Sequence, residues 1–193
     1  MNYRHVRVAL VLAAFLAGAV LSVGVILVAR DRPAAAAVGG PFRLTDQDGR
    51  TVTDEDLKGR TSLVFFGFTH CPDVCPTTLF DISQIMHALG PDADRTRAVF
   101  ITIDPERDTQ GVLKDYLSSF DPHVMALTGD LPSITTVARE YRAYFKKVPL
   151  DGGDYTMDHT AITYLMDKDM RFVSPFNLKR STEEAAADLR RHL

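Results

Sequence analysis

Cysteine is scarce in this chain: its 193 residues include only Cys71 and Cys75, and there is no tryptophan. Without a second cysteine pair, the chain cannot build an all-cysteine structural zinc site, which needs four protein ligands. A large excess of positive charge is also missing, because the formal net charge is −3. That balance argues against a nucleic-acid-binding protein. The remaining composition is globular, 46% hydrophobic and 24% charged, and suits one domain with a sizeable core.

Charged residues are absent from a long apolar run near the N-terminus, residues 8–29, which follows Arg4 and Arg7. A run of about 22 residues is long enough to span roughly 30 Å of hydrocarbon, and it exceeds the apolar core of a typical cleavable signal peptide. We therefore predict that residues 1–30 form an uncleaved, single-pass membrane anchor. The small residues at 34–37 keep open the alternative of a cleavage site.

The charges around this run predict its orientation. Two arginines precede the run and two follow it, so His5 and the α-amino group tip the balance toward a cytoplasmic N-terminus. No cysteine follows the run closely, which excludes lipoprotein-style anchoring. Residues 31–40 have the composition of a linker. The domain predicted for residues 41–193 then lies on the outer face of the membrane, an oxidising place.

Strand and helix patterns alternate along that domain. Short apolar segments indicate strands at residues 42–44, 51–53, 63–68, 98–103, 124–127, 161–166 and 172–173. Helical spacing of apolar residues follows the cysteines up to Leu89 and returns at 108–120 and 132–141. We expect Asp108 to cap the second helix, and Ser181 with Glu184 to form a capping box on a C-terminal helix. This order implies an α/β mixed sheet with helices on both faces, and it fits a thioredoxin-like fold with an N-terminal hairpin.

Both cysteines follow the central apolar strand directly, in the sequence FFGFTHCPDVCPTTL. Pro72 and Pro76 each come just after a cysteine, and proline fits the first turn of a helix. We therefore expect Cys71 at or just before a helix N-terminus and Cys75 one turn later. Residues four apart share a helix face, so the sulfurs can point at one target or at each other. A helix N-terminus also favours the thiolate form.

Two thiolates on one helical turn suit a metal site, a redox disulfide or a static disulfide. A thioredoxin-type redox motif has two residues between its cysteines, whereas three lie between Cys71 and Cys75. A metal site would need one or two further ligands, and histidine is the simplest source. His159 and His70 are the candidates, although a side chain at position 70 should point away from its neighbour Cys71.

Three sequence blocks, FTHCPDVCPTTL, ITIDPERDT and DHTAITYLMDKDMRF, resemble in order and spacing the signature blocks of the Sco/SenC family of copper proteins. The resemblance covers roughly residues 40–176. It implies a thioredoxin-like copper-binding domain at 41–193, anchored in a bacterial inner membrane with the domain in the periplasm. It also implies that Cys71, Cys75 and His159 bind copper, as Cu(I) or Cu(II).

Residues around His159 carry further expectations. The stretch 148–155 contains a Gly-Gly pair, and we expect it to be a mobile loop that delivers His159 to the cysteines. Asp158 is a candidate to orient the site from outside the ligand set. Asp104 and Arg107 follow the second long strand, at the same end of the sheet as Cys71, and are candidates to line the site. Arg107 would there favour the thiolate.

The resemblance implies a copper chaperone, not an enzyme, that delivers copper to the dinuclear copper centre of cytochrome c oxidase. Its partners would be the copper-binding subunit of the oxidase, the membrane, and other periplasmic copper carriers or thiol reductants. The main alternative is a thiol–disulfide oxidoreductase that reduces the cysteines of that subunit through a Cys71–Cys75 redox disulfide. A thiol peroxidase and a redox or copper sensor are further alternatives.

Overall fold

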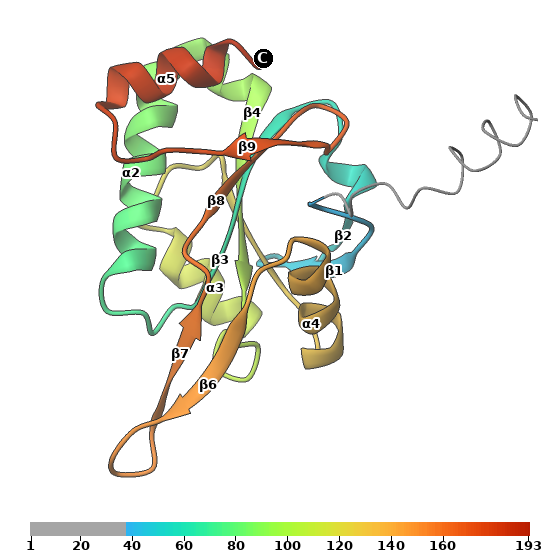
Figure 1. Ribbon diagram of the computed structural model, residues 1–193, viewed down its shortest axis with the longest axis vertical. Helices are drawn as coiled ribbons and strands as arrows, with labels where there is room; N and C mark the ends of the chain where they lie inside the picture. The colour runs from blue at the N-terminus through green and yellow to red at the C-terminus, as the bar shows by residue number, and fades with distance from the viewer. Residues whose placement is uncertain (1–37) are drawn as a thin grey trace, which may run out of the picture. The chain divides into compact units, whose positions relative to one another are not determined.

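A seven-stranded mixed sheet forms the centre of the protein, with strand order β2-β1-β5-β4-β3-β8-β9. The computed structural model describes residues 38–193 (Figure 1). The membrane anchor predicted for residues 1–30, and most of the predicted linker, lie outside this range. Within residues 38–193, no helix is both long enough and apolar enough to cross a membrane.

The central strands are those with the most continuous apolar sequence. β3 (Thr61–Gly67) is buried along its whole length, and it pairs in parallel with β4 (Thr96–Thr102) and antiparallel with β8 (Thr163–Met166). On its other side, β4 pairs in parallel with β5 (Val124–Thr128). The outer strands are β1 (Arg43–Asp46), β2 (Thr51–Thr53) and β9 (Phe172–Pro175), all of which join the sheet antiparallel.

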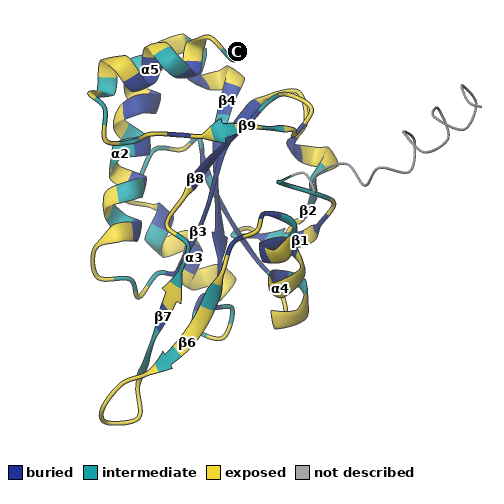
Figure 2. Cartoon of the chain, in the orientation of Figure 1, coloured by how far each residue is buried: buried dark blue, intermediate teal, exposed yellow. Residues whose placement is uncertain are grey.

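Alternate residues of β3 feed two hydrophobic cores, one on each face of the sheet. Leu63 and Phe65 pack with the apolar sides of α2 (Val74–Leu89), α3 (Gln110–Leu117) and α5 (Thr182–Arg190). Val64 and Phe66 pack with α4 (Leu131–Glu140) and the short 3-10 helix η1 (Glu55–Leu57). A second 3-10 helix, η2 (Gly90–Arg95), follows α2. Helices therefore cover both faces, and the N-terminal strands form a hairpin, as expected from the sequence (Figures 1 and 2).

Caps at the helix ends agree with the sequence in one case and differ in another. Ser181 and Glu184 form the predicted capping box at the start of α5. The predicted cap of α3 was wrong: Thr109 is the N-cap, and its hydroxyl accepts a hydrogen bond from the Val112 N–H. The Asp108 carboxylate is instead bound by other groups, described below.

The stretch 148–155, expected to be a mobile loop, is part of a β-hairpin. β6 (Phe145–Pro149) and β7 (Tyr155–His159) pair antiparallel as a separate two-stranded sheet. Only residues 150–154 form the turn, where Gly152 and Gly153 both have φ of +87°. His159 is therefore the last residue of a strand and not part of a loop.

Candidate metal centre

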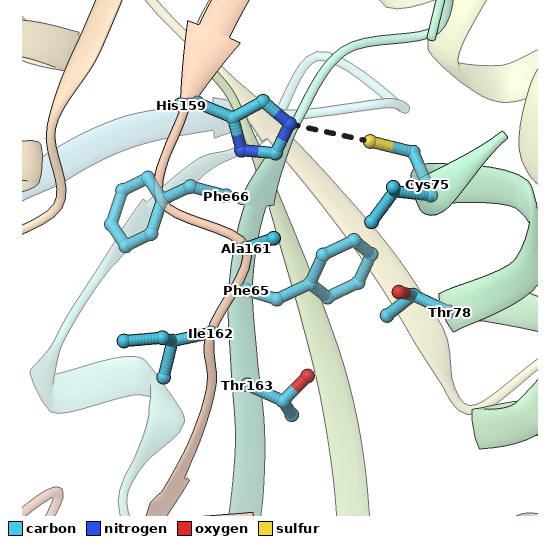
Figure 3. Close-up of a pocket in the computed structure, with 9 residues that line it drawn as sticks. Phe65, Phe66, Cys75, Thr78, His159, Ala161, Ile162 and Thr163 are labelled. Carbon is cyan, nitrogen blue, oxygen red and sulfur yellow. Dashed lines mark hydrogen bonds between the residues drawn. The ribbon is translucent and has the colours of Figure 1, made fainter. Parts of the chain in front are cut away.

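Two cysteines of one segment and a histidine from a distant strand meet at the carboxyl end of β3. The ligand atoms of Cys71, Cys75 and His159 all lie within 4.8 Å of one another. The Cys75 sulfur is 4.0 Å from His159 Nε2, and Figure 3 shows the imidazole facing that sulfur. Cys71 and His159 are half-buried, whereas Cys75 is buried. The described residues contain no other group of three such ligands at this spacing.

Cys71 lies in a turn that comes before the helix. Its N–H donates to the Phe68 carbonyl at 3.2 Å, and α2 begins only at Val74, with Asp73 as N-cap. Cys71 thus lies just before the helix, as expected, and Cys75 lies in its first turn. The sulfurs converge, because the N–H of Cys75 points at Cys71 Sγ at 3.5 Å. An N–H group at the N-terminus of α2 thus faces the Cys71 sulfur.

Cys75 lies in the apolar interior, with 1% of its surface exposed. Burial raises the pKa of its thiol, and the nearby Cys71 raises it further, against an opposing hydrogen bond from the Phe68 backbone. Both cysteines are free thiols in the structure. Because Cys75 is buried and Cys71 is only half-buried, the Cys71 sulfur is the more accessible of the two.

The His159 ring is oriented by its own neighbour. Nδ1 lies 3.1 Å from the Thr160 carbonyl oxygen, which can only accept a hydrogen bond. Nδ1 therefore carries the proton, and the lone pair of Nε2 faces Cys75. The ring also packs edge-on against Phe68, with 5.9 Å between centroids. This is the arrangement that orients a metal-ligating imidazole in proteins.

Comparison with known proteins identifies the family. The SCO1/SenC family model matches residues 30–193. The chain belongs to the SCO1/SenC family. It is 64% identical to Bradyrhizobium japonicum ScoI, solved with copper bound, over 81% of this chain and 100% of that one, with a TM-score of 0.79. Yeast Sco1 with copper bound is 35% identical, over 81% of this chain and 88% of that one, with a TM-score of 0.74. The SCO2-like protein RP587 of Rickettsia prowazekii is 42% identical, over 76% of this chain and 73% of its own length.

These likenesses support the thioredoxin-like arrangement expected from the element order of this SCO1/SenC chain. They also agree with the family resemblance carried by the three sequence blocks.

Two further residues of this SCO1/SenC chain shape the site, and sequence reasoning missed both. A Cβ at Gly67 would lie 2.5 Å from the Cys75 sulfur and 2.8 Å from a Phe100 ring carbon, so only glycine leaves room for the thiol. Asp108 is fully buried and accepts hydrogen bonds of 2.6 Å from the hydroxyls of both Thr69 and Thr102. Burial raises the pKa of Asp108, against the opposing effect of these hydrogen bonds.

Asp108 thereby ties the turn before Cys71 to the end of β4, since its carboxylate also accepts from the Thr69 N–H at 3.1 Å. The sequence signal for this role is weak, because an aspartate ahead of a helix pattern is more simply interpreted as a cap. The glycine signal was present, since Gly67 interrupts a buried strand just before the cysteines.

The remaining candidates lie around the cluster without joining it. Asp158 is exposed, and within the described residues its side chain has no hydrogen bond to His159. His70 is exposed as well, with Nδ1 3.1 Å from the Thr69 hydroxyl. Asp104 and Arg107 contact each other and Tyr155 of β7, so their contacts reach the hairpin that carries His159.

Proposed function

We propose that this protein is a membrane-anchored copper chaperone that binds copper through Cys71, Cys75 and His159. It delivers the ion to the dinuclear copper centre of cytochrome c oxidase. The observation that carries the proposal is the convergence of two thiols and one imidazole within 4.8 Å. Thiolates favour Cu(I), and imidazole accepts both oxidation states, so this mixed set suits a carrier of either ion. Copper-bound relatives at 64% and 35% identity support the same reading.

Copper is cargo in this proposal, and the protein is not an enzyme. Three protein ligands leave a coordination position for a group from the partner. The half-buried Cys71 and His159 give access to the ion from one side, while the buried Cys75 holds it from the other. The partner is the copper-binding subunit of the oxidase, and other periplasmic copper carriers or thiol reductants would load and reduce the site.

A second candidate function uses the same sulfurs. The contact between the Cys75 N–H and Cys71 Sγ brings the two cysteines to neighbouring positions, which favours a reversible disulfide. A thiol–disulfide oxidoreductase would reduce a disulfide of the oxidase subunit through a mixed disulfide, and Cys71 and Cys75 would be oxidised to a disulfide in return. This reaction needs no imidazole, so His159 separates the two functions.

The deciding experiment is copper titration of the purified protein and of Cys71→Ser, Cys75→Ser and His159→Ala. We expect the cysteine variants to lose both Cu(I) and Cu(II). A change outside the ligand set typically costs about 10–100-fold in metal affinity, and losing a ligand should cost at least as much. His159→Ala should therefore lose at least about 10–100-fold in Cu(II) affinity. It should lose less in Cu(I) affinity, because two thiolates satisfy Cu(I). Thiolate-to-Cu(II) absorption and metal counting report the result. His70→Ala is the matched control and should bind like the wild type.

Oxidase assembly in cells tests the biological step. Cells with His159→Ala should assemble less active oxidase, and added copper should restore part of it. The chaperone proposal is wrong if His159→Ala binds both copper ions like the wild type while the cysteine variants abolish assembly. The oxidoreductase would then be the better description.

The location of the protein is part of the proposal and rests on the sequence of residues 1–30. A single-pass anchor in the bacterial inner membrane, with the C-terminal domain in the periplasm, predicts that the protein stays with membranes after a carbonate wash. Mature protein that begins near Val38 and appears in the soluble periplasm would contradict the anchor, without affecting the copper site.

A further inference from the structure

The hairpin that carries His159 is not part of the main sheet. β6 and β7 pair only with each other, and the hairpin extends beyond the end of the seven-stranded sheet (Figure 1). Much of β6 is exposed (Figure 2). An isolated two-stranded hairpin is at best marginally stable in water. The contacts that fasten this hairpin to the domain therefore determine where the imidazole lies.

One group of these contacts joins Tyr155, at the start of β7, to the loop after β4. The Tyr155 hydroxyl donates to Asp104 Oδ1 at 2.8 Å, and Arg107 Nε donates to Asp104 Oδ2. Arg107 Nη1 donates to the Tyr155 carbonyl at 2.9 Å, and the guanidinium carbon lies 3.7 Å from the centroid of the Tyr155 ring. Asp104 is 3% exposed, so its carboxylate depends on these two donors.

The clamp formed by Asp104, Arg107 and Tyr155 also reaches the imidazole through Phe68. The Arg107 guanidinium lies 6.0 Å from the Phe68 centroid, and the His159 ring packs edge-on against the same phenyl ring at 5.9 Å. Phe68 is 2% exposed and therefore has little room to move. The clamp thus includes the first residue of the strand that ends in His159, and it contacts the ring on which the imidazole rests.

We infer that Asp104, Arg107 and Tyr155 are positioning residues for His159, and that they set how well the protein retains Cu(II) relative to Cu(I). The inference rests on the proposed copper function. Cys71 and Cys75 are placed by the end of β3 and the start of α2, not by the hairpin. Loosening the clamp should displace the imidazole and leave the two thiols in place. Cu(I), which two thiolates satisfy, should then be affected much less than Cu(II).

The test compares Asp104→Asn and Tyr155→Phe with the wild type in the full-length protein. Tyr155→Phe removes one hydrogen bond and keeps the ring under the guanidinium. We expect Asp104→Asn to weaken Cu(II) binding by about 10–100-fold, as other changes outside the ligand set do, and Tyr155→Phe to act in the same direction but less. The thiolate-to-Cu(II) absorption band should shift in both, while Cu(I) affinity stays close to that of the wild type. Tyr144→Phe, the same substitution at an exposed tyrosine just before β6, is the matched control.

A double-mutant comparison separates positioning from general destabilisation. If the clamp acts through the imidazole, Asp104→Asn should have no further effect on Cu(II) binding in a His159→Ala background. Equal losses of Cu(I) and Cu(II), an additive effect on His159→Ala, or wild-type Cu(II) binding by both clamp variants would overturn the inference. Tyr155→Phe decides the question if Asp104→Asn does not fold.

The two proposals fail in different ways. If His159→Ala itself binds Cu(II) like the wild type, the copper function is wrong and the clamp has nothing to position. If His159→Ala loses Cu(II) while both clamp variants keep it, only the clamp is wrong.

Discussion

The Cys75 thiol can lie in the buried interior because Gly67 has no side chain. Gly67 ends β3 next to Cys75, and a Cβ there would meet both the sulfur and the Phe100 ring. The sequence shows a glycine at the end of an apolar strand, which can be interpreted as a simple strand end. Its function becomes evident only when α2 is folded back along β3, because the contact joins residues on different elements.

Gly67→Ala should therefore weaken both the fold and the proposed copper site. Forcing an extra methyl into a packed interior typically lowers the free energy of unfolding by about 1–3 kcal/mol. We also expect weaker Cu(I) binding, because the Cys75 sulfur must move away from its present position. Urea unfolding and a Cu(I) competition titration measure the two effects. Gly111→Ala, in α3 with open space around the added methyl, is the control and should be neutral or slightly stabilising.

The two sulfurs should differ in reactivity. Burial raises the pKa of Cys75, whereas Cys71 is half-buried and reachable. Since the thiolate is the reactive form, reduced metal-free protein should be alkylated by iodoacetamide at Cys71 first. Mass spectrometry of Cys71→Ser and Cys75→Ser measures the two rates separately. Equal rates in the two variants would contradict the assignment, and a faster Cys71 would identify it as the sulfur that first engages a partner's thiol.

At the scale of elements, the buried strands and amphipathic helices were predictable, and the hairpin was not. β3 and β4 have continuous apolar sequences, and the apolar residues of α2 and α4 recur at helical spacing. The sequence of β6 is Phe-Lys-Lys-Val-Pro, which does not alternate between apolar and polar residues as a half-buried strand does. The strand lies outside the main sheet, so neither of its faces is packed in the way that would require this alternation. Its pairing with β7 is stabilised partly by Arg107 and Asp104, which are far away in sequence.

The sequence predicted the start of α2 only to within a few residues. Pro72 fits a first helical turn, but the Cys71 N–H is bonded to the Phe68 carbonyl, and this turn delays the helix until Val74. The identity of the three candidate ligands came from their residue types and the family resemblance. Their mutual distances required the hairpin, which local sequence patterns did not reveal.

One pH-dependent contact joins two elements outside the metal centre. His123, just before β5, has Nδ1 2.7 Å from Asp121 and Nε2 3.2 Å from Asp94 in η2. Burial lowers the pKa of His123, but the hydrogen bonds to the two carboxylates raise it by more, so the net shift is upward. A raised pKa means that the contact contributes its full stability below the unfolded pKa of about 6.5 and loses it as the pH rises through the folded value.

The free energy of unfolding should therefore fall as the pH rises from about 6 into the alkaline range, and His123→Gln should reduce that fall. Urea unfolding of both proteins at several pH values between about 5.5 and 8.5 measures the difference. The same pH dependence in wild type and His123→Gln would show that the contact does not contribute.

At the scale of the whole molecule, the candidate site connects parts of the chain that the fold keeps separate. Cys71 lies in the turn between β3 and α2, and Cys75 lies in the first turn of α2, whereas His159 ends a hairpin outside the main sheet. A bound ion would join the hairpin to the domain directly. Copper should therefore stabilise the native structure in addition to being carried by it.

Copper binding should raise the thermal unfolding temperature, and the size of the rise should depend on His159. A ligand at 100 times its Kd stabilises the native state by about 2.7 kcal/mol, which corresponds to several degrees for a domain of this size. We expect this rise for the wild type with Cu(I) or Cu(II), a smaller rise for His159→Ala with Cu(I), and the smallest rise for His159→Ala with Cu(II) at the same concentration. Calorimetry of the reduced protein with and without each ion measures it. An equal rise with Cu(II) in the wild type and His159→Ala would mean that the hairpin does not take part in binding, since the proposed site takes its hairpin ligand from His159.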